Sequence, residues 1–207
     1  MMRVGVLASG SGSNFQALVE GLARGPHARV ELLICNVPGA GALARAQQLG
    51  VPSVVLDHRE FKSASGFDRA AFDAKLVATL REHRIELVCL AGYMRLVGPT
   101  VLRAFPGRVL NIHPALLPSF PGLHGVRQAI EAGVKVAGCT VHFVDEGTDT
   151  GPIIAQAAVK VLPGDDEDAL AKRILVEEHR LYPAVVEALA RADVRLEGRA
   201  VHLREAL

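Results

Sequence analysis

The stretch Val4–Phe15 reads VGVLASGSGSNF, and it indicates the fold class more directly than any other part of the chain. Val4–Ala8 is a short, continuous apolar run, which is typical of a strand buried in a sheet. A turn rich in glycine and serine follows at once, and Phe15–Ala23 has the residue spacing of a helix. The chain therefore opens with a strand, a tight turn and a helix, the unit from which parallel sheets are built.

The same alternation of apolar runs and helical patterns continues through the first half of the chain. Continuous apolar strands separated by helices indicate a parallel sheet that is covered on both faces. We therefore predict an α/β fold that is Rossmann-like, with a mostly parallel central sheet and helices on both faces. The expected strands are Val4–Ala8, Val30–Cys35, Ser53–Leu56, Leu87–Ala91 and Val109–Ile112, and the expected helices are Phe15–Ala23, Ala42–Leu49, Arg69–His83 and Pro99–Ala104.

The pattern changes after His113. Three prolines within Pro114–Pro121 indicate a rigid loop, and strands of alternating polarity and a long amphipathic helix follow it. We expect the C-terminal part to contain antiparallel strands. Its expected elements are a short helix near Val126–Ala132, strands at Val136–Val144 and Ile153–Val161, a helix at Asp168–Ala190, and a hairpin of Val194–Leu196 with Ala200–Leu203.

The composition of the chain narrows the class of protein. With 207 residues, half of them hydrophobic, the chain fits one domain with a large core. A net charge of +1 with interspersed signs lacks the basic footprint of a nucleic-acid-binding protein. No run of about 18 apolar residues predicts a membrane span, and no signal-peptide pattern opens the chain. Cys35 and Cys89 lie in apolar runs and are expected in the core, so a cytoplasmic, reducing setting fits best.

The turn Ser9–Asn14 is a candidate site for an anion. Backbone N–H groups at a helix N-terminus favour negative charge. The dinucleotide fingerprint is absent, because Phe15 stands where its third glycine belongs, and no P-loop lysine follows. A phosphate on a small molecule is the expected ligand, and the alternative is that Ser13 or Asn14 acts only as an N-cap.

The stretch Asn111–Pro114 ends a predicted strand with an amide and an imidazole two residues apart. Residues i and i+2 of a strand point to the same face, so Asn111 and His113 emerge side by side. An amide N–H can hold an oxyanion, an imidazole can move a proton near neutral pH, and Asp149 could orient and charge that imidazole. These are the parts of an acyl-transfer site, although a strand end with two capping polar residues gives the same pattern.

Two further observations bear on the site. The chain has three asparagines, Asn14, Asn36 and Asn111, and all three lie at the carboxyl ends of predicted parallel strands, where α/β sheets bind ligands. The roles of His124, after the proline-rich loop, and His142, in an alternating strand, stay open between a site and an ordinary packed or solvated position. No histidine or cysteine spacing of a metal centre occurs, so we expect no metal.

Four motifs, in this order and at sensible spacing, carry a resemblance that runs through almost the whole chain. The chain resembles the phosphoribosylglycinamide formyltransferases of the folate-dependent formyltransferase superfamily. The whole superfamily shares the residues that match Asn111, His113 and Asp149. The turn Ser9–Asn14 and the Pro-Gly-x-His segment Pro121–His124 point to the phosphoribosylglycinamide formyltransferases within it. The motifs are Ser9–Asn14, Ala91–Arg95, Asn111–His124, and Gly138–Val144 with its continuation to Asp149–Pro152.

The resemblance implies a single formyltransferase domain over residues 1–207, with a nucleotide- and phosphate-binding half at 1–110 and a catalytic and folate-binding half at 111–207. It implies that 10-formyltetrahydrofolate is the co-substrate and glycinamide ribonucleotide the acceptor, in a monomer or homodimer with no nucleic-acid or membrane partner. The implied catalytic residues are Asn111, His113 and Asp149. The implied nucleotide-binding residues are Gly12, Ser13, Asn14 and Glu178, and the implied folate-binding residues are Arg69, Met94, Arg95, Leu96, Val97, Asn111, Val144, Asp145 and Asp149.

The reaction implied by the resemblance is formyl transfer in de novo purine synthesis. The substrate amine attacks the formyl carbon, Asn111 and protonated His113 stabilise the oxyanion, and Asp149 charges His113 or relays a proton through water. A formyltetrahydrofolate deformylase would use the same three residues with water as the nucleophile. A non-catalytic sugar-phosphate binder would keep only the glycine-rich turn, and a methionyl-tRNA formyltransferase would be expected to continue into an RNA-binding domain after Leu207.

Overall fold

The computed structural model describes residues 1–63 and 66–205 of the chain. The chain divides into two compact units, Met1–Leu110 and Asn111–Leu207. That the two halves form a single formyltransferase domain stays a prediction.

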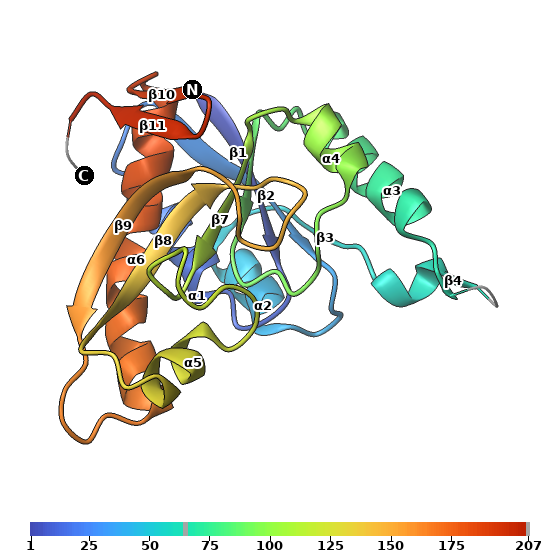
Figure 1. Ribbon diagram of the computed structural model, residues 1–207. Coiled ribbons are helices and arrows are strands. Elements are labelled where there is room, and N and C mark those ends of the chain that lie inside the picture. The colour runs from blue at the N-terminus through green and yellow to red at the C-terminus, as the bar shows by residue number, and fades with distance from the viewer. Residues whose placement is uncertain (64–65, 206–207) are drawn as a thin grey trace. The chain divides into compact units, whose positions relative to one another are not determined.

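Within the described residues, seven strands belong to one sheet, in the order β3-β2-β1-β6-β7-β8-β9 (Figure 1). Four of them belong to the first unit and two to the second, and β7 runs across the boundary in the chain. The strands are β1 Met2–Ala8, β2 Ala28–Cys35, β3 Ser53–Val55, β6 Leu87–Leu90, β7 Val109–His113, β8 Val136–Phe143 and β9 Ile153–Lys160.

In the first unit, β1 pairs in parallel with β2 and β6, and β2 pairs in parallel with β3. Gly5 allows a close approach to β1, since a Cβ there would lie 3.0 Å from side-chain atoms of both Leu80 and Ile85. Phe15 and Leu18 of the first helix are fully buried, which is the apolar face that its spacing predicts. The helices of this unit are α1 Ser13–Leu22, α2 Gly41–Leu49, α3 Arg69–Glu82 and α4 Pro99–Ala104.

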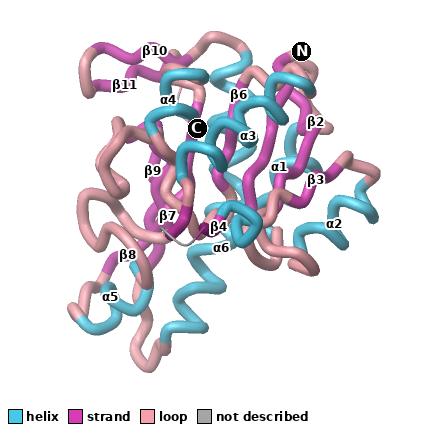
Figure 2. Tube along the Cα trace, turned by 90° about the vertical axis from the view of Figure 1, so that its right-hand side faces the viewer, coloured by secondary structure: helices cyan, strands magenta, loops and turns pink. Residues whose placement is uncertain are grey.

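In the second unit, β8 pairs with β9 in an antiparallel register that places Thr140 opposite Gln156. The long helix α6, Glu167–Ala190, runs along both strands (Figure 1). Its N-terminus is capped by the Asp166 side chain, which accepts from Ala169 N–H at 2.8 Å. The remaining elements are α5 Gly125–Glu131 and the antiparallel hairpin of β10 Val194–Glu197 with β11 Ala200–Leu203 (Figure 2).

The predicted fold class is confirmed, and each expected element is present with its ends shifted by at most two residues. The prediction missed a 3-10 turn, η1 His58–Phe61, and a pair of two-residue strands, β4 Lys62–Ser63 and β5 Gly66–Phe67. Such short elements show no period in the sequence, and η1 begins through a local cap, where Asp57 accepts from Arg59 N–H at 2.9 Å.

Among the described residues, no helix is both long enough and apolar enough to cross a membrane.

Candidate active site

In the first unit, the turn between β1 and α1 is built from backbone. Gly12 is the N-cap of α1 at φ 78° and ψ 23°, a left-handed conformation that glycine adopts without strain. A Cβ on Gly12 would lie 2.6 Å from Cα of Ala42, so space and backbone angle both require glycine. The N-cap residue is Gly12, which makes no side-chain hydrogen bond to the helix, so the alternative that Ser13 or Asn14 is the N-cap is wrong. A first turn without a side-chain cap is suited to binding an anion.

Helix α2 holds this turn in place. Arg45 Nε donates to Ser11 O at 2.9 Å, and its Nη1 donates to Gln16 Oε1 in the first turns of α1. The backbone N–H of Ala42 donates to Gly10 O at 3.0 Å. These contacts fix the turn and place a guanidinium beside it, and its charge also favours an anion.

The segment Tyr93–Gly98 follows β6 in the first unit and presents apolar side chains. Met94 is 66% exposed and Leu96 is 61% exposed, which is unusual for large apolar residues. The Arg95 guanidinium stacks 4.0 Å above the centre of the Phe67 ring, an attractive cation–π geometry. The segment therefore exposes two large apolar side chains, while the side chain of Arg95 between them packs on Phe67.

Helix α3 supplies further anchors for that segment. Arg69 Nη1 donates to Leu96 O at 2.9 Å, so Arg69 contacts the segment predicted to bind folate. Asp73 is buried and accepts from Gly98 N–H. Burial raises the pKa of its carboxyl, although Arg69, Arg95 and this hydrogen bond oppose the rise. A Cβ on Gly98 would lie 1.9 Å from Asp73 Oδ2, so glycine is required for this contact.

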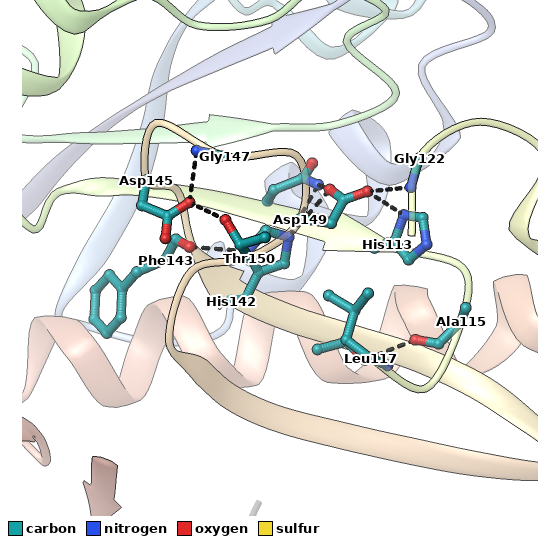
Figure 3. A network of polar contacts seen from close by, with 12 residues as sticks. His113, Ala115, Leu117, Gly122, His142, Phe143, Asp145, Gly147, Asp149 and Thr150 are labelled. Carbon is teal, nitrogen blue, oxygen red and sulfur yellow. Dashed lines mark hydrogen bonds and ion pairs between the residues drawn. The ribbon is translucent and has the colours of Figure 1, made fainter. Parts of the chain in front are cut away.

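In the second unit, β7 ends with Asn111 and His113, and Asp149 meets both side chains. Asn111 Nδ2 donates to Asp149 Oδ1 at 3.3 Å. His113 Nδ1 lies 3.3 Å from Asp149 Oδ2 (Figure 3). The contact expected between Asp149 and His113 is therefore present. Gly122 N–H also donates to Asp149 Oδ2, at 2.8 Å.

His113 is buried between two acceptors. Its Nε2 donates to the carbonyl of Phe120 at 2.8 Å, while its Nδ1 faces the Asp149 carboxylate. An imidazole with acceptors at both nitrogens has the hydrogen-bonding pattern of an imidazolium, in which both nitrogens are donors. The surroundings of His113 therefore suit the charged ring.

His142 also belongs to the network, so the sequence's open question about its position is resolved in favour of the site. It is only 2% exposed, and its Nδ1 donates to the carbonyl of Phe143 at 2.8 Å. Its Nε2 lies 3.2 Å from Asn111 Nδ2 and 3.6 Å from Asp149 Oδ1. In the neutral ring Nε2 accepts an N–H of Asn111, whereas in the protonated ring it carries a proton and a positive charge beside Asp149. The amide nitrogen of Asn111 is thus shared between His142 and Asp149, which fixes the orientation of the amide.

Asp149 is held as a carboxylate by this arrangement. Burial raises the pKa of Asp149, but the hydrogen bond to His142, the Gly122 N–H and the charges of His113 and His142 outweigh burial, so the net pKa lies below 3.8. The side chain is 13% exposed. A negative charge is therefore maintained beside His113 at neutral pH.

The proline-rich loop reaches this network because Thr140 of β8 anchors it. The Thr140 hydroxyl donates to Ala115 O at 2.6 Å and accepts from Leu117 N–H at 3.0 Å. Gln156 Nε2 of β9 donates to the Thr140 hydroxyl and to Leu117 O, each at 2.9 Å. This fully bonded anchor sets the course of the loop that carries the Phe120 carbonyl and the Gly122 N–H.

Asp149 itself comes from a second loop, which follows β8. Asp145 Oδ1 accepts from Thr150 Oγ1 at 2.6 Å and from Gly147 N–H at 3.1 Å, which folds the loop onto itself (Figure 3). A Cβ on Gly147 would lie 2.0 Å from Thr150 Oγ1, so this loop conformation requires glycine at that position. Asp149 has φ 54°, a left-handed angle that points its carboxylate into the network.

Three further predicted site residues, Glu178, Val144 and Asp145, belong to the second unit. Glu178 is buried on α6, and the pKa of the nearby Cys139 thiol is raised to about 12 by burial and by the Glu178 charge. Val144 and Asp145 begin the loop after β8. His124 is exposed at the N-cap of α5.

The sequence did not single out two participants of the network and left the role of a third, His142, open. The Phe120 carbonyl and the Gly122 N–H are backbone groups and leave no signal in the side-chain pattern. His142 was visible only as one histidine in an alternating strand. The described residues contain no group of histidine, cysteine and acidic side chains that could hold a metal ion.

Comparison with known proteins gives consistent relatives. A model of the formyl transferase family matches residues 2–186. The phosphoribosylglycinamide formyltransferase of Bacillus subtilis is 46% identical over 190 residues, which cover 91% of this chain and 95% of that protein. The trifunctional purine biosynthetic protein adenosine-3 of Drosophila melanogaster is 52% identical over 190 residues, but the chain spans only 14% of that longer protein.

A solved structure agrees with the sequence matches. The crystal structure of glycinamide ribonucleotide transformylase 1 from Symbiobacterium toebii superposes on this chain with a TM-score of 0.92 at 51% identity. The superposition covers 98% of this chain and 94% of that one.

Proposed function

Because the chain belongs to the formyl transferase family, we propose that it transfers the formyl group of 10-formyltetrahydrofolate to the amino group of glycinamide ribonucleotide, a step of de novo purine synthesis. The observation that carries the proposal is the contact of Asp149 with both Asn111 and His113. Amide, imidazole and carboxylate are the groups that acyl transfer to an amine requires.

The nucleotide amine is the nucleophile in the proposed reaction. Its attack on the formyl carbon gives a tetrahedral oxyanion, which charged His113 and an N–H of Asn111 stabilise. To bind the oxyanion, the amide group of Asn111 gives up one of its two present acceptors. Of these, the bond to Asp149, at 3.3 Å, is longer than the bond to His142, at 3.2 Å. Asp149 maintains the charge of His113 and relays a proton, through water, from the amine to the departing folate nitrogen. No covalent enzyme intermediate forms, so the buried cysteines need no part in the reaction.

Each substrate has a proposed set of contacts. The phosphate of the nucleotide lies on the backbone of Gly12, Ser13 and Asn14, and Glu178 contacts the rest of that substrate. The exposed apolar edge of Met94–Val97 packs against the pteridine, and Val144 and Asp145 begin the loop that covers it. Arg69 lies at the start of α3, where its charge suits the glutamate carboxylates of the folate.

We also propose that the two halves act as one domain, in the cytoplasm, and that the protein is a monomer or homodimer that needs no metal, nucleic acid or membrane. Sedimentation of the purified protein at several concentrations tests the oligomeric state.

Incubation with both substrates tests the function. We expect tetrahydrofolate to accumulate from 10-formyltetrahydrofolate only when glycinamide ribonucleotide is present, with one formylated nucleotide per folate. Formate release without the nucleotide would identify a deformylase instead, and no turnover with intact nucleotide binding would identify a sugar-phosphate binder. Asp149→Asn is the matching inactive variant, and Asp168→Asn, an exposed position on α6, is its control.

A further inference from the structure

Asn36 is the asparagine at a strand end that the proposed reaction leaves unused. It is only 3% exposed, although it follows β2 directly. Its side-chain oxygen accepts a short hydrogen bond of 2.6 Å from the hydroxyl of Ser9. Its backbone carbonyl accepts from His58 Nδ1 at 3.1 Å. A buried amide with such partners is a fixed point in the first unit.

Ser9 connects this fixed point to two loops. Its Oγ donates to Asn36 and accepts from Met94 N–H at 2.9 Å. The one hydroxyl proton of Ser9 is therefore used, and its oxygen also serves as an acceptor. The backbone N–H of Ser9 donates to Gly92 O at 3.1 Å. One residue therefore joins the ends of β1, β2 and β6.

The two loops that Ser9 joins have different proposed ligands. Ser9 directly precedes the turn Gly10–Asn14, which is assigned to the nucleotide phosphate. Met94 opens the apolar segment Met94–Val97, which is assigned to the pteridine. When one ligand rigidifies its loop, a residue bonded to both loops also rigidifies the other, so the second ligand binds at a lower cost in conformational entropy.

We propose that Ser9 is a positioning residue whose hydroxyl couples the nucleotide-binding turn to the folate-binding segment, so that each substrate strengthens the binding of the other. This inference rests on the proposed function for the identity of the two ligands. The hydrogen bonds of Ser9, by contrast, can be tested without either ligand.

Amide hydrogen exchange tests the connection in the ligand-free protein. Met94 N–H should be protected in the wild type, and Ser9→Ala should increase its exchange rate at least about tenfold, because the acceptor is lost. Ser9→Thr keeps the hydroxyl and should restore protection. Ser53→Ala, an exposed serine in the same unit, is the control and should leave Met94 unchanged. Unchanged Met94 exchange in Ser9→Ala would overturn the proposal.

Titration calorimetry tests the coupling with a pair of ligands that does not react, glycinamide ribonucleotide and tetrahydrofolate. In the wild type, saturating tetrahydrofolate should lower the Kd of the nucleotide about fivefold or more, and the nucleotide should lower the Kd of the folate by the same factor. Ser9→Ala should reduce this factor to near one, and Ser9→Thr should restore it. Asn36→Ala breaks the other side of the bridge and should also reduce it.

The outcomes separate this inference from the proposed function. A wild type that transfers the formyl group, yet binds the two ligands independently, would overturn the coupling and leave the function intact. Coupling that survives in folded Ser9→Ala would do the same. A wild type that binds neither ligand and transfers no formyl group would refute the function, and with it the coupling.

Discussion

The two candidate binding regions are built from different materials. In the first unit, the turn around Gly12 offers backbone N–H groups, and its shape depends on a left-handed angle and on the closeness of Ala42. In the second unit, Asn111, His113 and Asp149 offer side chains that exchange hydrogen bonds and charge. The backbone turn contains no titratable group, whereas the side-chain network contains three, His113, Asp149 and the neighbouring His142.

This difference predicts two kinds of failure. A substitution in the turn acts through geometry, so it should weaken binding with little dependence on pH. A substitution in the network acts through charge and hydrogen bonding, so it should reduce turnover more than binding. The following predictions test that division.

The largest effect is expected in the network. Asp149→Asn should keep the fold and much of the folate binding but lower kcat by about 10²- to 10⁴-fold, and His113→Ala should lower it by a comparable factor. Because both residues act on one transition state, the double variant should be little worse than the worse single variant. The measurement is a double-mutant cycle on kcat at saturating substrates and fixed pH. Losses that add fully in free energy would mean that Asp149 acts without His113.

A smaller effect is expected in the backbone turn. Gly12→Ala combines a left-handed angle, which costs about 1–2 kcal/mol for a residue with a Cβ, with a contact of 2.6 Å to Ala42. We expect the Kd of the nucleotide to rise about tenfold or more at every pH tested, with a lowered Tm. Gly39→Ala has a similar angle, φ 76°, but open space around the Cβ, so it is the control for strain without a clash. Equal nucleotide affinities for the two variants, measured by calorimetry, would count against the phosphate site.

The pH dependence of stability should separate the regions further. The folded-state pKa of Asp149 lies below its unfolded value, so the carboxylate stabilises the fold above the unfolded pKa and loses that contribution as the pH falls through the folded-state pKa. The difference in unfolding free energy between wild type and Asp149→Asn, about 1.5–3 kcal/mol for hydrogen bonds to a charged group, should be present at about pH 5 and should shrink as the pH falls below 3.8. Urea unfolding across that range provides the measurement. A difference that grows on acidification would contradict the assigned shift.

The smallest effect is expected at the C-terminal hairpin, which lies beyond the residues matched by the family model. Arg199, in the turn between β10 and β11, donates to Thr150 O next to Asp149. Because the side chain is exposed, Arg199→Ala should lower kcat less than about threefold and leave the Kd of the nucleotide unchanged. Arg195→Ala on the same hairpin controls for general loss of charge. A loss as large as that of Asp149→Asn would show that the hairpin contributes directly to catalysis.

The sequence determined much of this protein because the relevant signals are local. Runs such as Val4–Ala8 and Val109–Ile112 have the composition of buried strands, and the helical spacing between the strands predicts a mostly parallel sheet. The i, i+2 spacing of Asn111 and His113 places both side chains on one face, since strands alternate. The turn that contains Gly12 was singled out because a glycine- and serine-rich turn between a strand and a helix exposes backbone N–H groups, which favour an anion.

The tertiary structure alone decided which groups meet those residues. His142 meets Asn111 across 31 positions of sequence, and the backbone groups of Phe120 and Gly122 meet His113 and Asp149 because Thr140 and Gln156 anchor the loop between them. Ser9 and Asn36 meet because β1 and β2 pair in parallel register. Contacts of this kind depend on strand pairing and loop course, which involve residues distant in the chain, whereas periodicity and turn chemistry report only on neighbours.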